Sequence, residues 1–382
     1  MSTQVVVLVP GLFGFESFGH GAERISYFDQ VAARLALFTE EEPRRIVVHK
    51  PPPTGALAWR VQSLFDLVRA LLRDGHQGQP VDRVHLVGHS TGGVDVRLLM
   101  NSRYGWPGAP SGAERTAFFP RVGAVISLSA PHRGSPIARR LRGTLEAAIP
   151  QFYLVSILAK QGSLDLRDKS MLIYSSLLQL LKGDVAEGVR GPMSTLPPSA
   201  AAEVARFLDD IVEDRALIHD LTPLAMRRLN AAIEGGEWPR LRCYVTAAPR
   251  PGLRAALTAS LGLQALQWAF YAAAFGLTEP SGEESQPFPG GPWIGTSPLG
   301  SAVAGSDAND GVVPSGAQVV SGAAAGLVEG DHVDVVGHFT SKRFAGTTVF
   351  KSGSGFDDER FDALWRAIAN DIKAARVSTS SA

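Results

Sequence analysis

The most constraining feature of this sequence is an apolar segment that runs directly into a glycine-rich turn. Residues 84–93 read VHLVGHSTGG, and residues with helical spacing follow from Val94. The chain holds 40 glycines in 382 residues, so the G-x-S-x-G pattern would be weak evidence without its context. A buried strand before the pattern and a helix after it place Ser90 on a sharp strand-to-helix turn. We therefore expect the Ser90 hydroxyl above the edge of a sheet, at a helix N-terminus.

This context predicts a nucleophile elbow, in which a strained turn presents a serine hydroxyl for attack on a carbonyl. Gly88, Gly92 and Gly93 would leave room for the turn and for close backbone packing. The alternative is a glycine-rich helix start whose serine has no chemical role.

The first third of the chain alternates strand and helix patterns. Helical spacing covers 57–73 and 94–100, and short apolar runs cover 5–9, 46–49, 84–87 and 123–129. Continuous apolar strands between helices are typical of a parallel sheet covered on both faces. The pattern predicts an α/β fold with a mostly parallel central sheet.

The strand pattern disappears between 136 and 237 and resumes at 241–247. We therefore predict a core formed by 1–135 and 238–376, a helical cap inserted at 136–237, and a helix-plus-loop insertion at 250–306. The core should end in an amphipathic helix over 357–374, and the tail at 377–382 should be disordered. Within the cap, helical spacing covers 138–149, 152–160, 171–181, 200–212 and 223–233.

Charge and cysteine content exclude several classes of protein. Lys plus Arg and Asp plus Glu both number 37, and a chain without net charge lacks the basic surplus of a nucleic-acid binder. The single cysteine, Cys243, lies in an apolar run and rules out an intramolecular disulfide and a cysteine-based metal site. The first residues enter a strand pattern without the features of a secretory leader, so we expect a cytoplasmic location.

The segment 255–277 carries no charge and is rich in alanine and aromatic residues. Its length could span a bilayer, but polar residues such as Gln264 and Gln267 make it a poor span. We favour a cap helix that faces the site or contacts a lipid interface transiently. An ordinary buried helix is the remaining alternative.

A serine hydroxyl needs a histidine that takes its proton and an acid that orients the histidine. After a nucleophile elbow the chain order is serine, acid, histidine. Asp310 lies in the turn-rich segment NDGVVP (309–314), and His332 follows in the polar segment EGDHVD (329–334). With Ser90, order and loop setting, together with the family resemblance described below, predict a catalytic triad of Ser90, Asp310 and His332.

Other residues compete for these positions. Asp307 shares the loop of Asp310, and His338 lies in a more apolar setting that suits a structural histidine. His89 adjoins the serine, but neighbouring side chains at a sharp turn should point apart. His132 follows a strand and could line the rim of the site, although a hydrogen-bonded structural role is favoured.

The reaction also needs hydrogen-bond donors for the oxyanion. The backbone N–H of Thr91, directly after the nucleophile, is one predicted donor. The second normally comes from the loop after an early strand, here PGLFGF at 10–15, and Leu12 is our choice.

Together, several segments resemble the bacterial triacylglycerol lipases of the α/β-hydrolase superfamily, in the family order. They are PGLFGF (10–15), GHSTGG (88–93), SAPHRGS (129–135), WIGTSPL (293–299), NDG (309–311) and HVD (332–334). The resemblance covers about 1–140 and 290–340, and Pro10 stands where the family usually has a histidine. It implies an α/β-hydrolase fold, the triad named above, and hydrolysis of carboxylic esters with apolar acyl chains, including lipids.

The same triad would serve an acyltransferase or a thioesterase, and a non-catalytic binding protein on this fold is a third alternative. We expect no cofactor. Many of these lipases hold a structural Ca²⁺ partly through the aspartate two residues after the histidine, here Asp334. However, the 290–306 loop contains no Asp or Glu that could be the second acidic ligand. The sequence leaves calcium and the oligomeric state open.

Overall fold

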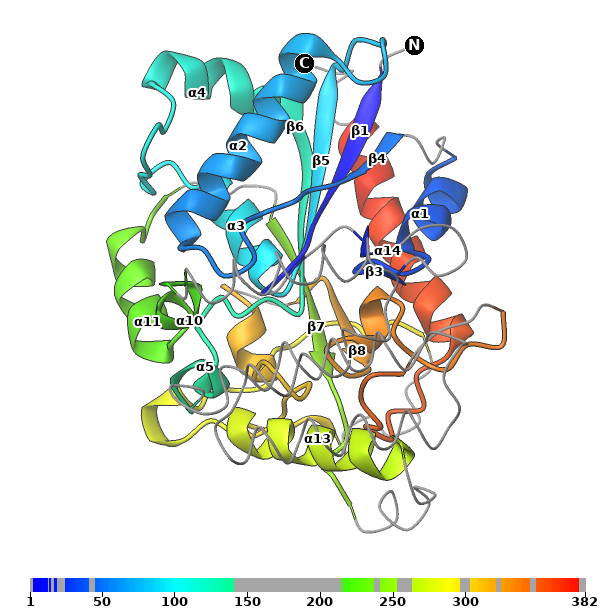
Figure 1. The fold of residues 1–382 in the computed structure, drawn as a ribbon. Coiled ribbons are helices and arrows are strands. Elements are labelled where there is room, and N and C mark those ends of the chain that lie inside the picture. Colours follow the sequence, from blue (N-terminus) through cyan, green and yellow to red (C-terminus); the bar gives the residue numbers. More distant parts are fainter. Residues whose placement is uncertain are drawn as a thin grey trace, which may run out of the picture.

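The structure is a computed structural model of the chain, drawn in Figure 1. It describes residues 3–12, 14, 17–18, 25–40, 45–140, 214, 216–236, 241–252, 263–295, 303–320, 324–343 and 348–377. The helices predicted over 152–160, 171–181 and 200–212 lie outside the described residues, as does most of the predicted cap. So do 253–262, 296–299 and the tail from residue 378.

Six strands form the central sheet, in the order β4-β1-β5-β6-β7-β8. All five neighbouring pairs are parallel. The fold class predicted from the alternating pattern is therefore confirmed. The strands are β1 (Gln4–Val9), β4 (Ile46–Val48), β5 (Arg83–His89), β6 (Val122–Leu128), β7 (Leu241–Ala247) and β8 (Gly326–Glu329).

Helices cover both faces of the sheet (Figure 1). Successive side chains of β1 point to opposite faces, so Val5 and Val7 join one core cluster while Val6 and Leu8 join another. The first cluster is covered by α2 (Leu57–Asp74) and α3 (Thr91–Met100), and the second by α1 (Val31–Thr39) and α14 (Asp358–Val377). Burial on both faces explains why these strands read as unbroken apolar runs.

The C-terminal helix fixes the loop that follows β8. Trp365 of α14 is fully buried, and its indole N–H donates to the Val335 carbonyl at 3.0 Å. Removing such a side chain typically costs about 3–5 kcal/mol, so this contact anchors the loop firmly to the core.

The remaining elements lie around this framework. Ser111 caps the helix α4 (Gly112–Phe118) through a capping box with Glu114, which satisfies two N-terminal N–H groups. These elements are the antiparallel pair β2 (Ser17–Phe18) and β3 (Ile25–Ser26), the helices α4 (Gly112–Phe118), α5 (Pro136–Arg140), α10 (Ala216–Asp220), α11 (Pro223–Ala232) and α13 (Leu263–Thr278), and the 3₁₀ turns η3 (Phe119–Arg121), η4 (Gly282–Glu284), η6 (Ser315–Gln318) and η7 (Asp334–Val336).

Most predicted elements in the described residues agree with the structure to within a few residues. Several elements were not predicted, among them the helices α1, α4 and α10 and the strand pair β2 and β3. The four-residue strand β8 was not predicted, because it is short and begins at a glycine. Helix α14 continues to Val377, the first residue of the predicted tail. Within the described part of the chain, no helix has the length and apolarity to cross a bilayer.

Candidate active site

Ser90 stands at the turn between β5 and α3 in a strained backbone conformation, with φ 55° and ψ −128°. Such a conformation typically costs about 1–3 kcal/mol and persists only where the surroundings enforce it. The glycines near Ser90 show how the surrounding backbone enforces this conformation. A Cβ on Gly92 would lie 2.0 Å from the Val9 carbonyl oxygen, and a Cβ on Gly88 would lie 2.1 Å from that of Gly92. Any side chain at 88 or 92 would therefore disrupt the turn.

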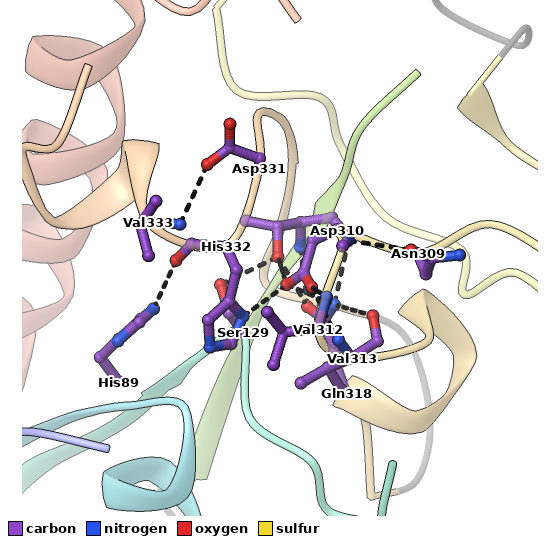
Figure 2. A network of polar contacts seen from close by, with 12 residues as sticks. His89, Ser129, Asn309, Asp310, Val312, Val313, Gln318, Asp331, His332 and Val333 are labelled. Atoms are coloured by element: carbon purple, nitrogen blue, oxygen red, sulfur yellow. Dashed lines mark hydrogen bonds and ion pairs between the residues drawn. The ribbon is translucent and has the colours of Figure 1, made fainter. Parts of the chain in front are cut away.

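The loops after β7 and β8 bring Asp310 and His332 together at the same edge of the sheet. The His332 Nδ1 lies 2.9 Å from Asp310 Oδ2, and the Asp310 carbonyl accepts the His332 backbone N–H at 2.9 Å (Figure 2). A carboxylate only accepts, so Nδ1 carries the proton and Nε2 has a free lone pair. The histidine is thus held in the tautomer of a general base.

The Asp310 carboxylate is completely buried, and donors converge on both of its oxygens. The N–H groups of Val312 and Val313 donate to Oδ1 at 3.0 and 2.8 Å. The Thr246 hydroxyl and the Gln318 amide donate to Oδ2 at 2.6 and 3.2 Å, beside His332. This set compensates for the lost solvation of a buried charge and fixes the plane of the carboxylate.

Ser90, Thr91, Leu12 and His332 line one cavity of about 110 Å³. The loop of Leu12 lies directly against the serine, since a Cβ on Gly11 would fall 2.5 Å from Ser90 Cβ and 2.9 Å from Ser90 Oγ. The structure thereby brings the five residues predicted from the sequence together. Ser90, Thr91, Leu12 and His332 share the cavity, and Asp310 joins them through its bond to His332.

A buried ion pair between α2 and α3 also holds the loop of Leu12. Arg60 of α2 lies 2.7 Å from Asp95 of α3, and the same guanidinium nitrogen donates to the Pro10 carbonyl at 2.8 Å. Both side chains are fully buried. Buried pairs of this kind add little net stability but determine geometry, and here they join the loop to the helix that begins at the serine.

The competing residues have other partners. Asp307 is exposed and pairs with Arg250 at 2.5 Å. His338 is buried and bonds to the Tyr27 carbonyl through Nε2 at 3.0 Å. His132 bonds to the Ser127 hydroxyl and lines a separate polar cavity rather than the rim of this one.

Four residues of this site were not predicted from the sequence. Thr246 and Gln318 hold the acid, but neither belongs to a motif. The side chain of His89 contacts the loop of His332, since its Nε2 lies 2.8 Å from the His332 carbonyl oxygen (Figure 2). Tyr27 contacts the other nitrogen of His89 at 2.7 Å. For His89, adjacency to the serine was the only signal in the sequence.

Two buried carboxylates flank His332. Asp331 Oδ1 accepts the backbone N–H of Asp334 at 3.0 Å, and Asp334 Oδ2 accepts that of Asp331 at 3.1 Å and the Ser354 hydroxyl at 2.9 Å. Hydrogen-bond donors thus occupy Asp331 Oδ1 and Asp334 Oδ2, whereas the buried Asp331 Oδ2 has no hydrogen-bond partner among the described residues. In the described ranges, no three His, Cys, Asp or Glu side chains gather around a common point. Ca²⁺ takes six to eight oxygen ligands, and the described residues around Asp334 bring two carboxylates together.

Burial makes this carboxylate pair sensitive to pH. Desolvation raises the pKa of Asp331 to about 6, and desolvation together with the Asp331 charge raises the pKa of Asp334 well above its ordinary value. The folded state therefore binds more protons than the unfolded chain between about pH 4 and pH 6. The contribution of the pair to stability is present below this window and is lost as the pH rises through it.

We expect Asp331→Asn to raise the melting temperature at pH 8 relative to the parent protein, and to have little effect near pH 4. The amide keeps the Oδ1 acceptor for the Val333 and Asp334 N–H groups and removes a buried charge. Thermal unfolding measured across pH 4–8 tests this. Asp66→Asn, at a half-buried surface carboxylate that pairs with Arg69, is the control. Equal shifts in the two variants at pH 8 would contradict the expectation.

Comparison with known proteins supports the fold. No protein-family model and no curated protein sequence matches the chain. Lipase 1 from Pelosinus fermentans superposes with a TM-score of 0.53 at 14% identity, over 99% of this chain and 100% of that one. EstA from Clostridium botulinum superposes with a TM-score of 0.51 at 14% identity, over 97% and 87%. The chain thus has the α/β-hydrolase fold of bacterial lipases and esterases, as its motifs predicted.

Proposed function

We propose that this protein is a serine hydrolase of carboxylic esters that carry apolar acyl chains, acting through Ser90, His332 and Asp310. One observation carries the proposal: a histidine whose Nδ1 is bound to a buried carboxylate lines the same cavity as a serine on a strained strand-to-helix turn. The α/β-hydrolase fold agrees with this chemistry but does not establish it.

In the proposed reaction, Ser90 Oγ attacks the ester carbonyl while His332 Nε2 takes the hydroxyl proton. Asp310 stabilises the imidazolium that forms. The backbone N–H groups of Leu12 and Thr91 donate to the oxyanion of the tetrahedral intermediate. His332 then returns its proton to the leaving alkoxide, which departs as the alcohol and leaves an acyl-enzyme. His332 then takes a proton from a water that attacks the acyl carbon, and it delivers that proton to Ser90 Oγ as the bond to the acyl group breaks, so the acid is released and the reaction needs no cofactor.

The cavity indicates the substrate. Most of its lining is apolar and includes residues of α5, α10 and α13 and of the segment around Phe350. An engineered cavity of roughly 150 Å³ in another protein admits benzene, so a cavity of about 110 Å³ holds roughly four carbon atoms. We propose a preference for short acyl chains, with the 255–277 segment contacting a lipid interface when the ester is presented there.

Two measurements test the assignment. Hydrolysis of p-nitrophenyl esters of increasing acyl length, dissolved or emulsified, should be fastest for short chains. A fluorophosphonate should label one residue, Ser90, located by peptide mass spectrometry. Labelling at another residue, or no ester hydrolysis by the intact protein, would overturn the proposal.

Phe270 of α13 limits the cavity. Its ring is half-buried and stacks on Phe350, with centroids 5.6 Å apart and an interplanar angle of 28°. We expect Phe270→Ala to raise the ratio of kcat/KM for octanoyl over butanoyl esters about tenfold, the effect of accommodating roughly one more methylene, which contributes about 1–3 kcal/mol in an apolar pocket.

Phe119→Ala is the matched control, because Phe119 is also half-buried but does not line the cavity. It should leave the chain-length ratio unchanged. An unchanged ratio in Phe270→Ala would show that this aromatic wall does not set the acyl length, while ester hydrolysis itself would stand.

A further inference from the structure

A chain of buried hydrogen bonds connects the loop of Leu12 with the loop of His332. The Gly11 N–H donates to the Tyr27 hydroxyl oxygen at 3.0 Å. That hydroxyl lies 2.7 Å from His89 Nδ1, and His89 Nε2 lies 2.8 Å from the His332 carbonyl oxygen. Tyr27 and His89 are almost completely buried. The proposed reaction uses neither side chain directly.

The direction of each bond follows from the chemistry of the groups. The His332 carbonyl can only accept, so His89 Nε2 carries a proton. Burial and the nearby His332 lower the pKa of His89 well below its ordinary value, so the ring is neutral and its Nδ1 is an acceptor. The Tyr27 hydroxyl must then donate to Nδ1 while its oxygen accepts the Gly11 N–H. Every bond runs from the Gly11 loop towards the His332 loop.

Other contacts hold this chain in place. The Tyr27 carbonyl accepts a hydrogen bond from His338 Nε2 at 3.0 Å, and the Asp29 N–H donates to the Val336 carbonyl at 2.9 Å. The imidazole rings of His89 and His332 lie with their centroids 4.7 Å apart. Residues 27–29 are thus attached to the loop that carries the histidine, and a shift of one loop would be passed to the other.

We propose that Tyr27 and His89 are positioning residues that hold the oxyanion loop and the general base in fixed relation around Ser90. The inference rests on the proposed function. Leu12 follows Gly11 directly, so the bond to Tyr27 fixes the peptide next to the predicted oxyanion donor. The bond from His89 fixes the backbone of the histidine itself. The Leu12 N–H and His332 must both contact the same tetrahedral intermediate. A misplacement of either group by about 1 Å can lower the rate roughly 100-fold.

Tyr27→Phe removes the central hydroxyl and leaves the Gly11 N–H and His89 Nδ1 without this partner. We expect kcat to fall about 10- to 100-fold while KM changes less than about twofold, because the chain orients groups that act in the transition state. Tyr244→Phe is the matched control. Its buried ring also carries a hydrogen-bonded hydroxyl, which donates to Asp371 at 2.7 Å, and Tyr244 does not line the cavity. The control should lose comparable stability and keep its kcat.

Substitutions of His89 separate positioning from packing. His89→Leu fills the space without hydrogen bonds and should lower kcat as Tyr27→Phe does. His89→Gln supplies an amide donor and acceptor and should recover part of the loss. In the double variant Tyr27→Phe/His89→Leu, the loss should be close to that of the worse single variant, because both break one chain.

A Tyr27→Phe variant with the kcat of Tyr244→Phe would overturn the positioning role and leave ester hydrolysis intact. If Tyr27→Phe does not fold, His89→Gln and His89→Leu carry the test alone, and equal kcat values in these two would reject the inference. Absence of ester hydrolysis and of Ser90 labelling in the parent protein would instead reject the proposed function.

Discussion

Ser90→Ala is expected to lower kcat for ester hydrolysis by a factor on the order of 10⁶, the loss seen when a triad nucleophile is removed from a serine hydrolase. The hydroxyl oxygen is the atom that bonds to the acyl carbon, so no other group in the cavity replaces it. Residual turnover would come from the oxyanion donors and from substrate binding. The measurement is single-turnover and steady-state hydrolysis of a butanoyl ester.

The same variant should keep its fold. Residue 90 has φ 55° in the parent protein, and alanine keeps the Cβ of serine, so the substitution adds no new steric conflict at the turn. The melting temperature should therefore change little, and fluorophosphonate labelling should disappear. Ser281→Ala, which removes an exposed hydroxyl near Glu284, is the control and should keep full activity. Hydrolysis by Ser90→Ala at the parental rate would refute the assignment of the nucleophile.

The fold and the candidate triad could be predicted because their signals are local. β5 and β6 read as apolar runs since both of their faces are buried, and the turn at Ser90 needs glycines at fixed positions that are visible in the sequence. Asp310 and His332 lie in turn-rich loops after late strands, in the order that the nucleophile elbow requires. The structure brings these loops together because parallel strands end at one edge of the sheet.

The contacts around the triad could not be predicted, because they depend on pairs of residues far apart in the sequence. Thr246 meets Asp310 across 64 residues, and His89 meets the His332 backbone across 243. Neither threonine nor a histidine beside a serine has a characteristic spacing that would reveal such a partner. The orientation of the His89 side chain depends on its contact with Tyr27, 62 residues away in the sequence, and no local pattern encodes this contact.

Asp310→Asn is expected to lower kcat by about 10⁴-fold, because an amide at this position selects the wrong histidine tautomer. The asparagine carbonyl would remain with the Val312 and Val313 N–H groups that now bind Oδ1. Its NH₂ group would then face His332 Nδ1, which must become an acceptor. The proton moves to Nε2, where it blocks the removal of the Ser90 proton. Since a buried charge also disappears, stability should change far less than activity.

The neighbouring acid provides the decisive control for this prediction. Asp307 is the alternative acid in the same loop of the sequence. Unlike Asp310, it is exposed and pairs with Arg250 at the surface. Asp307→Asn should therefore keep parental kcat, whereas Asp310→Asn should recover activity only partly at high pH, where hydroxide can replace the general base. Matched kinetics of the two variants across pH 6–10 separate the alternatives. Equal losses in both would mean that the loop as a whole, rather than the Asp310 carboxylate, supports catalysis.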